Sequence, residues 1–252
     1  MSVFADGVLS SSIARLVGDA QRFGLSPSKM VRRLSPGPSI PGIVCVSFPK
    51  SGTHLLERIL YLHPYLHRKL VRTLTTYWHS ATRVRSILEG LRTCQFVLMH
   101  WPADPWIVEQ LAQGEQTTLY ITRDPRDVVV SLVYYLQKHP HHPRTASFAQ
   151  VNTFEEQLAI AIRGTKDYPD VGTRLARYRP WEQVGLTVAF EDLISTKTRA
   201  AELKRIFDYI DLDVSDELLT SMADRMISTA SPTYRRGGDR KSTRLNSSHR
   251  YV

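Results

Sequence analysis

The chain has 252 residues, 42% of them hydrophobic, which suffices for one α/β domain with a large buried core. Its net charge of +9 indicates an anionic partner, but no lysine or arginine run is long enough for a nucleic-acid tail, so a small polyanion fits better. Two cysteines and the lack of a bilayer-length apolar run argue against a disulfide framework or a membrane span and favour the cytoplasm.

Residues 1–40 form a basic segment in which a short amphipathic patch is followed by Ser- and Pro-rich spacing. A mitochondrial transit peptide would be poor in acidic residues, and Asp6 and Asp19 argue against one. We therefore expect a poorly ordered lead-in, with the folded domain beginning near residue 41.

A buried strand is predicted at 43–46, where four apolar residues, three of them β-branched, follow the breaker pair Pro41-Gly42. An apolar-periodic helix begins near residue 55. The loop between them carries Lys50, Ser51, Gly52, Thr53 and His54. Such a loop presents backbone N–H groups at a helix N-terminus, and the lysine adds a full positive charge. This chemistry suits a phosphate or sulfate group, although the standard P-loop order Gly-Lys-Ser/Thr is absent.

The next segment, residues 61–78, is basic and aromatic, and it is equally compatible with a substrate wall and with a solvated face. A helix is predicted over 80–91 and a second buried strand over 95–99. This strand delivers His100 to its carboxyl end. A histidine there is often an ordinary loop residue, but its near-neutral pKa also suits a general base.

A third strand, 118–122, ends at Arg123 and is followed by a helix through residue 133. Asp124 is a natural N-cap, and Pro125 suits the first helical position. Local structure does not explain Arg123 together with Ser131, eight residues later on the helix. An arginine fork and a serine hydroxyl can together grip a phosphate.

The remaining chain predicts helices over 154–165, 173–179, 197–210 and 215–226, and a fourth strand over 186–190 that Glu191-Asp192 closes. His139, His141 and His142 suggest metal binding, but no carboxylate or cysteine stands nearby at ligand spacing. We expect a mobile substrate loop there and no metal. A basic glycine turn, Arg235-Arg236-Gly237, follows the last helix.

The string Phe48-Pro49-Lys50-Ser51-Gly52-Thr53 resembles the 5′-phosphosulfate loop of the cytosolic-type sulfotransferases. The Arg123–Ser131 spacing resembles that family's 3′-phosphate motif, and both motifs occur in the family's order. The resemblance covers residues 41–237. It implies a single α/β domain, 41–238, with a mostly parallel central sheet flanked by helices, like that of P-loop nucleotide kinases. The donor it implies is 3′-phosphoadenosine 5′-phosphosulfate (PAPS), without a metal.

The resemblance also implies roles for individual residues. His100 matches the catalytic base, and Lys50 would neutralise charge on the bridging oxygen. The implied donor-binding residues are Lys50, Ser51, Gly52, Thr53, His54, Arg123, Ser131, Phe190, Arg235, Arg236 and Gly237. Two positions depart from the pattern: Leu55 replaces a common tryptophan, and Phe190 replaces a tyrosine. Both changes concern base recognition and not the transferred group.

Residues 239–252 carry no core pattern and resemble the translation of a sequencing-library adapter. We expect this tail to be non-native and the domain to be incomplete at its C-terminal end. The implied partner is a small acceptor with a hydroxyl or amine, with no nucleic acid and no transmembrane segment, and a homodimer is compatible with this view. A P-loop-like nucleotide kinase or NTPase, and a non-catalytic nucleotide-binding relative, are the alternative functions.

Overall fold

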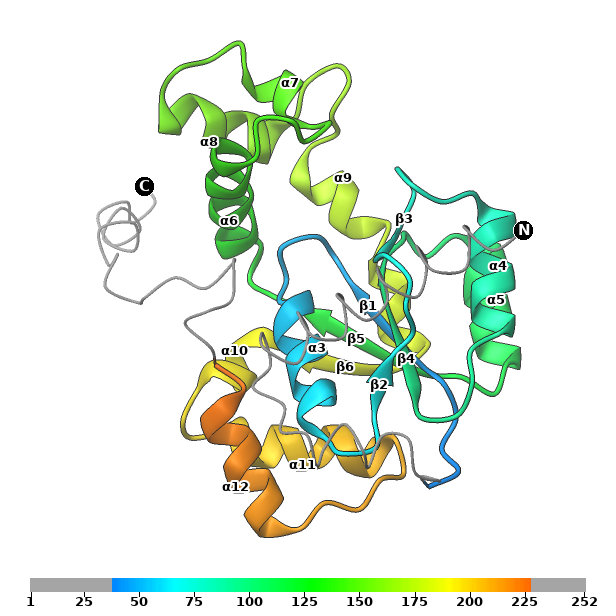
Figure 1. Cartoon of the computed structure of the whole chain (residues 1–252). Helices are drawn as coiled ribbons and strands as arrows, with labels where there is room; N and C mark the ends of the chain where they lie inside the picture. The colour runs from blue at the N-terminus through cyan, green and yellow to red at the C-terminus, as the bar shows by residue number, and fades with distance from the viewer. Residues whose placement is uncertain (1–37, 228–252) are drawn as a thin grey trace, which may run out of the picture.

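The computed structural model describes residues 38–227, and a parallel β-sheet lies at its centre (Figure 1). The strands are β1 (Ile43–Ser47), β2 (His67–Arg68), β3 (Leu74–Thr75), β4 (Gln95–His100), β5 (Thr117–Thr122) and β6 (Leu186–Ala189). They run in the order β2-β4-β1-β5-β6, with β3 also paired to β4. Every strand pair is parallel, which confirms the predicted α/β class.

Strand β1 is buried along its whole length because β4 and β5 flank it and helices cover both faces of the sheet. Its side chains alternate between two cores. Ile43 and Cys45 belong to one cluster, and Val44 and Val46 belong to the other. A strand buried on both faces needs apolar residues at every position, which is why the sequence shows a continuous apolar run instead of alternation.

The helices are α3 (Thr53–Leu62), α4 (Ala81–Glu89), α5 (Pro105–Gln113), α6 (Pro125–Lys138), α7 (Thr145–Phe148), α8 (Phe154–Arg163), α9 (Val171–Ala176), α10 (Phe190–Ile194), α11 (Arg199–Tyr209) and α12 (Asp216–Arg225), with a 3₁₀ turn, η1, at Arg179–Gln183. Helices α3, α11 and α12 cover one face of the sheet (Figure 1). Helices α4 and α5 and the turn η1 cover the other face. None of the helices within residues 38–227 has the length and apolar character that a membrane span requires.

Helices α6, α7 and α8 form a separate lobe above the carboxyl edge of the sheet, and α9 leads back from it (Figure 1). This lobe has a small apolar core of its own. Val133 and Leu136 of α6 are buried there with Phe148 of α7 and Ala161 of α8. Since α6 begins directly after β5, one end of the lobe is fixed to the sheet.

The carboxyl ends of β1 and β4 meet at a topological switch point. The chain leaves β1 into α3 on one face of the sheet and leaves β4 into α5 on the opposite face. Open parallel sheets bind ligands in the crevice where neighbouring connections diverge in this way. Lys50 follows β1 and His100 ends β4, so the fold brings both predicted catalytic residues to this edge.

Several predicted boundaries differ from the structure. Strand β6 ends at Ala189, and Phe190 begins helix α10 because Glu191 and Asp192 favour a helical first turn. The prediction that Phe190 belongs to the strand is therefore wrong. Helix α9 begins at Val171, earlier than predicted, because the Asp170 carboxylate accepts a hydrogen bond from the Thr173 amide.

Three predicted segments lie wholly or mainly outside the described residues. They are the lead-in 1–40, apart from residues 38–40, the basic turn Arg235-Arg236-Gly237, and the tail 239–252. Their predicted roles remain predictions.

Candidate functional site

The loop after β1 turns sharply, and glycine is required at its end. Gly52 has a φ of 106° and forms the N-cap of α3, a conformation that side chains disfavour. A Cβ placed on Gly52 would also lie 2.5 Å from Cδ2 of Phe190. Lys50 has a φ of 79°, and the Ser51 amide donates to the Phe48 carbonyl at 3.1 Å, which closes the turn.

The loop offers amide donors at the start of α3. Within residues 38–227, the N–H groups of Gly52 and Thr53 have no backbone acceptor. Unpaired donors in the first helical turn, together with the helix dipole, favour an anion at this position. Ser51 is buried within the loop, with 1% of its surface exposed. The predicted anion loop therefore has suitable geometry for a phosphate or sulfate group.

A chain of hydroxyl groups connects this loop to His100. Thr53 Oγ1 lies 2.7 Å from Ser47 Oγ, which lies 3.0 Å from His100 Nδ1. The Ser47 carbonyl oxygen is also 3.0 Å from Nδ1. A carbonyl oxygen only accepts hydrogen bonds, so Nδ1 carries the proton and donates a hydrogen bond to the Ser47 carbonyl oxygen. Nε2 of His100 consequently keeps its lone pair.

The pKa of His100 is lowered from 6.5 to about 4, chiefly because burial disfavours the charged imidazolium. The hydrogen bond to the Ser47 backbone opposes this shift, while the positive charges of His54, Arg144 and Lys50 strengthen it. At neutral pH the ring is uncharged, and Nε2 is available as a proton acceptor.

Lys50 lies between the loop and the lobe. Its Nζ is 3.9 Å from the centre of the Tyr135 ring on α6, a cation–π contact. Its carbonyl oxygen accepts a hydrogen bond of 3.4 Å from Nη1 of Arg123. The structure thus brings together the predicted lysine of the loop and the predicted arginine at the end of β5.

Arg123 is held in place but keeps donor capacity. Its guanidinium lies 4.3 Å from the centre of the Phe190 ring, and Nη2 is 3.8 Å from the Asp127 carboxylate. Nε is buried and has no hydrogen-bond partner among the described residues. Burial lowers the pKa of Arg123, and the neighbouring carboxylates, Asp127 first, oppose that shift. A partly buried guanidinium with an unsatisfied donor suits a phosphate.

Two other predicted residues, His54 and Ser131, lie on helices α3 and α6. Nδ1 of His54 lies 2.9 Å from Oε2 of Glu57, one turn further along α3. Ser131 is half-buried on α6, two turns beyond Pro125.

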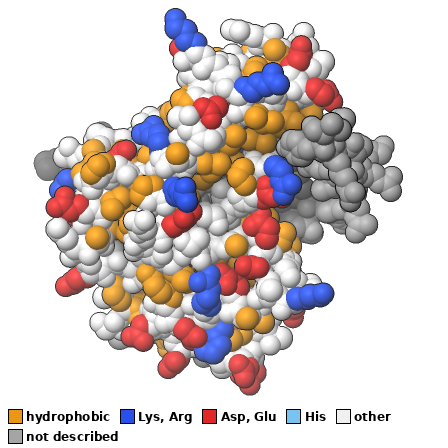
Figure 2. Space-filling view, turned by 180° about the vertical axis from the view of Figure 1, so that it is seen from behind, with side chains coloured by type: hydrophobic (Ala, Val, Ile, Leu, Met, Phe, Trp, Pro, Cys, Tyr) orange, Lys and Arg blue, Asp and Glu red, His pale blue; other side chains and the backbone are white. Residues whose placement is uncertain are grey.

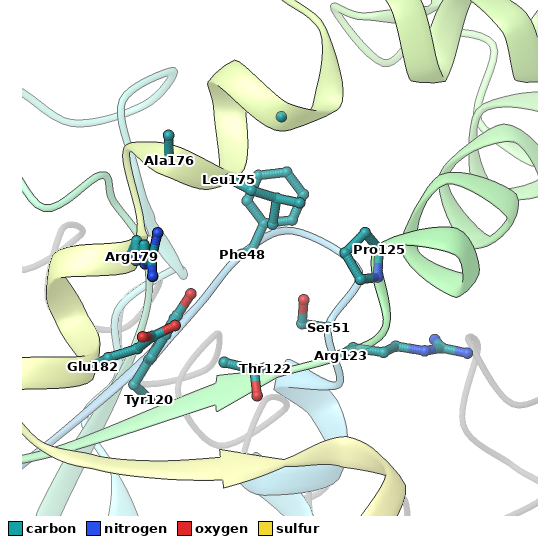
Figure 3. Close-up of a pocket in the computed structure, with 11 residues that line it drawn as sticks. Phe48, Ser51, Tyr120, Thr122, Arg123, Pro125, Leu175, Ala176, Arg179 and Glu182 are labelled. Atoms are coloured by element: carbon teal, nitrogen blue, oxygen red, sulfur yellow. The ribbon is translucent and has the colours of Figure 1, made fainter.

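A cavity of about 360 Å³ adjoins the loop (Figure 3). Ser51 and Arg123 line it from the loop and from the end of β5, and Arg179 and Glu182 of η1 line the opposite side. Tyr120 projects into the same space, and burial together with the Glu182 charge raises its pKa to about 12. His100 and Lys50 are not among the lining residues. The cavity therefore adjoins the loop and Arg123 but does not include the predicted catalytic residues.

The surface charge is mixed on the face of the molecule that Figure 2 shows. Lysine and arginine side chains are interspersed there with aspartate and glutamate, and no continuous basic patch covers this face. Among residues 38–227, no group of three or more His, Cys, Asp or Glu side chains is arranged to hold a metal ion.

Two residues of the site escaped the sequence analysis. Ser47, which bonds to His100, is the single polar residue of β1, and its place at the strand's carboxyl end was the available signal. Tyr135, which contacts Lys50, follows Ser131 by one helical turn and so lies on the same face of α6. Without the fold, neither signal connects the residue to its partner.

A parallel sheet with a glycine-containing loop that leads from β1 into a helix at its carboxyl edge defines a P-loop-like α/β protein. Within this class the chain belongs to the sulfotransferase family, because the family's sulfotransferase domain model matches residues 41–231. This match confirms the predicted family and does not favour the nucleotide kinase alternative.

A solved sulfotransferase structure shares the fold. Mouse sulfotransferase SULT7A1, complexed with PAP, superposes with a TM-score of 0.58 at 21% sequence identity, covering 78% of this chain and 68% of that one. Two structures of retinol dehydratase, one with androsterone and inactive cofactor PAP and one with retinol and PAP, give TM-scores of 0.49 and 0.48 at 16% and 14% identity. They cover 74% and 80% of this chain and 64% and 70% of theirs. No curated protein matches the chain.

Proposed function

We propose that this chain transfers a sulfuryl group from PAPS to a hydroxyl or amine of a small acceptor, with His100 as the base. The observation that carries the proposal is the geometry of His100. Its Nδ1–H donates to the Ser47 carbonyl at 3.0 Å, which leaves Nε2 unprotonated at the edge of the sheet where the anion loop ends.

The described residues suit the donor. The amides of Gly52 and Thr53 and the hydroxyl of Ser51 would hold the 5′-phosphosulfate, and His54 stands at the same helix start. The unsatisfied Nε of Arg123 supports its proposed role at the 3′-phosphate, and Ser131 of α6 is proposed for the same phosphate. Arg235, Arg236 and Gly237 are proposed for the same phosphate from the family resemblance.

Phe190 contacts both the loop and Arg123. Its ring packs against Gly52 and beneath the Arg123 guanidinium. We therefore propose that Phe190 orients Arg123 and the loop, in addition to contacting the adenine. This contact needs the ring and not a hydroxyl, so replacing the family's tyrosine by phenylalanine preserves it.

The reaction requires one proton transfer and one displacement. Nε2 of His100 takes the proton as the acceptor oxygen or nitrogen bonds to sulfur. The bond between sulfur and the bridging phosphate oxygen then breaks, and Lys50 neutralises the negative charge on that oxygen. Adenosine 3′,5′-bisphosphate (PAP) leaves. As in phosphoryl transfer, orientation and fixed charges supply most of the rate.

The acceptor is proposed to be a small molecule, and a homodimer and a cytoplasmic location remain proposals. Cys45 and Cys94 are buried free thiols, and burial raises the pKa of both. Such thiols pack as small apolar groups and suit a reducing compartment.

Single-turnover transfer of labelled sulfate from PAPS to a panel of phenols, alcohols and amines tests the proposal. His100→Ala should lower the rate by about 10²–10⁴ while PAP affinity stays within about twofold. His54→Ala tests the alternative assignment, because His54, at the start of α3, is the other histidine that could act as the base. Loss of turnover only in the His54 variant would show that the base is assigned wrongly. Tight PAP binding without transfer to any acceptor would show a non-catalytic relative.

A further inference from the structure

Arg144 is a half-buried cation without an acidic partner. It lies between α6 and α7, and its Nε donates a hydrogen bond of 2.6 Å to the Tyr77 hydroxyl. Its guanidinium carbon is 5.3 Å from the centre of the Tyr77 ring and 5.4 Å from that of Tyr168. Within residues 38–227 no carboxylate forms an ion pair with Arg144, and neither Nη1 nor Nη2 donates a hydrogen bond.

A second arginine faces the same ring. Arg174 of α9 has only 8% of its surface exposed, and its guanidinium carbon lies 4.3 Å from the centre of the Tyr168 ring. It donates to the carbonyl oxygens of Pro169 and Ala161, each at 2.9 Å, and has no ion-pair partner in the described part of the chain. Burial and the charge of Arg144 both lower the pKa of Arg174. Two cations around one ring, without a carboxylate, destabilise the folded chain unless an anion pairs with them.

Tyr168 lies against both arginines. Only 5% of its surface is exposed, and its hydroxyl group interacts with the Arg174 side chain. Arg174 therefore has the Tyr168 side chain and two backbone carbonyl oxygens as partners, whereas Nη1 and Nη2 of Arg144 stay available to an anion.

Charges and ring contacts connect this cluster with His100 and Lys50. The charges of Arg144 and Lys50 both act on His100 and on His142. Aromatic contacts connect the two cations: the Tyr135 ring, which contacts Lys50, lies 5.5 Å from the His142 ring, which lies 6.4 Å from the Tyr77 ring. The hydrogen bond from Arg144 to the Tyr77 hydroxyl completes this series of contacts from Lys50 to Arg144.

We propose that the acceptor carries an anionic group, such as a carboxylate, that pairs with Arg144 while its apolar body lies against the exposed Tyr77 ring. The inference rests on the proposed sulfotransferase function and adds the acceptor class to it. The attraction between the arginine charge and such an anion would offset the free-energy cost of desolvating the anion. A neutral isostere would leave the cations unpaired.

Calorimetry on the complex with PAP tests the inference without requiring turnover. The probes are two matched pairs: 3-(4-hydroxyphenyl)propanoate with its amide, and 12-hydroxydodecanoate with its amide. At least one carboxylate should bind about tenfold or more tightly than its amide. Arg144→Gln should reduce this preference to about one, and Arg144→Lys should retain part of it. Arg83→Gln, an exposed arginine on α4, is the matched control and should leave the preference unchanged.

Equal affinity within both pairs, or no binding of either carboxylate, would overturn the inference. A tenfold loss of PAP affinity in Arg144→Gln, with the carboxylate preference retained, would also overturn it, because Arg144 would then serve the donor. Failure of the proposed function is a separate result: PAP would not bind, or labelled sulfate would reach no acceptor of the panel.

Discussion

The depressed pKa of His100 makes the stability of the chain depend on pH in a defined direction. His100 titrates at about 4 in the folded chain and near 6.5 when unfolded. As pH falls below 6.5, the unfolded chain takes up the proton first, so stability present above pH 6.5 is lost progressively toward pH 4. Between pH 8 and pH 5 the difference between the two pKa values of His100 lowers the free energy of unfolding by about 2 kcal/mol.

Urea unfolding of the wild type and of His100→Gln at pH 8, 6.5 and 5 measures this effect. Glutamine is neutral throughout, so the variant should lose about 2 kcal/mol less than the wild type over this range. All other titrating groups are common to both proteins and cancel in the comparison. Equal losses in the two proteins, or a His100 pKa near 6.5 measured directly by NMR, would refute the argument that burial keeps this ring neutral.

Three further predictions concern the loop, the core and the donor. Gly52→Ala should destabilise the fold by about 1–3 kcal/mol in urea unfolding, because φ is 106° and the new Cβ would meet Phe190; an unchanged midpoint would contradict this. Arg68→Met should lower the unfolding free energy by about 3 kcal/mol at pH 7, because Glu57, which is 1% exposed, loses its 2.5 Å ion pair with Arg68. The double variant Arg68→Met, Glu57→Gln should recover part of this loss. Calorimetry should show PAP binding at least about tenfold tighter than AMP, with Arg123→Gln removing most of this difference; equal affinities in the wild type would argue against a 3′-phosphate site.

The sequence was sufficient to predict the central strands and the edge at which the site lies. Continuous apolar runs at 43–46 and 96–99 can be buried only between two layers, and each ends at a polar residue or a glycine-containing turn. Parallel strands place those ends together, so Lys50, His100 and Arg123 were predictable as neighbours before their contacts were known.

Other features depend on contacts between distant segments. Strands β2 and β3 have two residues each and form only because β4 offers an edge, so no pattern could reveal them. Helix α5 was not among the predicted helices, although the sequence indicates its start: Asp104 suits an N-cap and Pro105 suits a first helical position. The cations around Tyr168 come from segments thirty residues apart, and only the folded lobe shows that both contact one ring without a carboxylate partner among residues 38–227.

The hydroxyl chain from Thr53 through Ser47 to His100 has a consequence for how substitutions combine. Thr53 lies in the loop proposed to hold the donor, and His100 is the base proposed to act on the acceptor, yet each is hydrogen-bonded to the same serine, Ser47. A change on one side therefore alters the geometry on the other, and the two effects are not independent. Double-variant cycles across this serine should be non-additive, so an engineer who optimises donor use and acceptor choice separately cannot simply combine the best substitutions of each search.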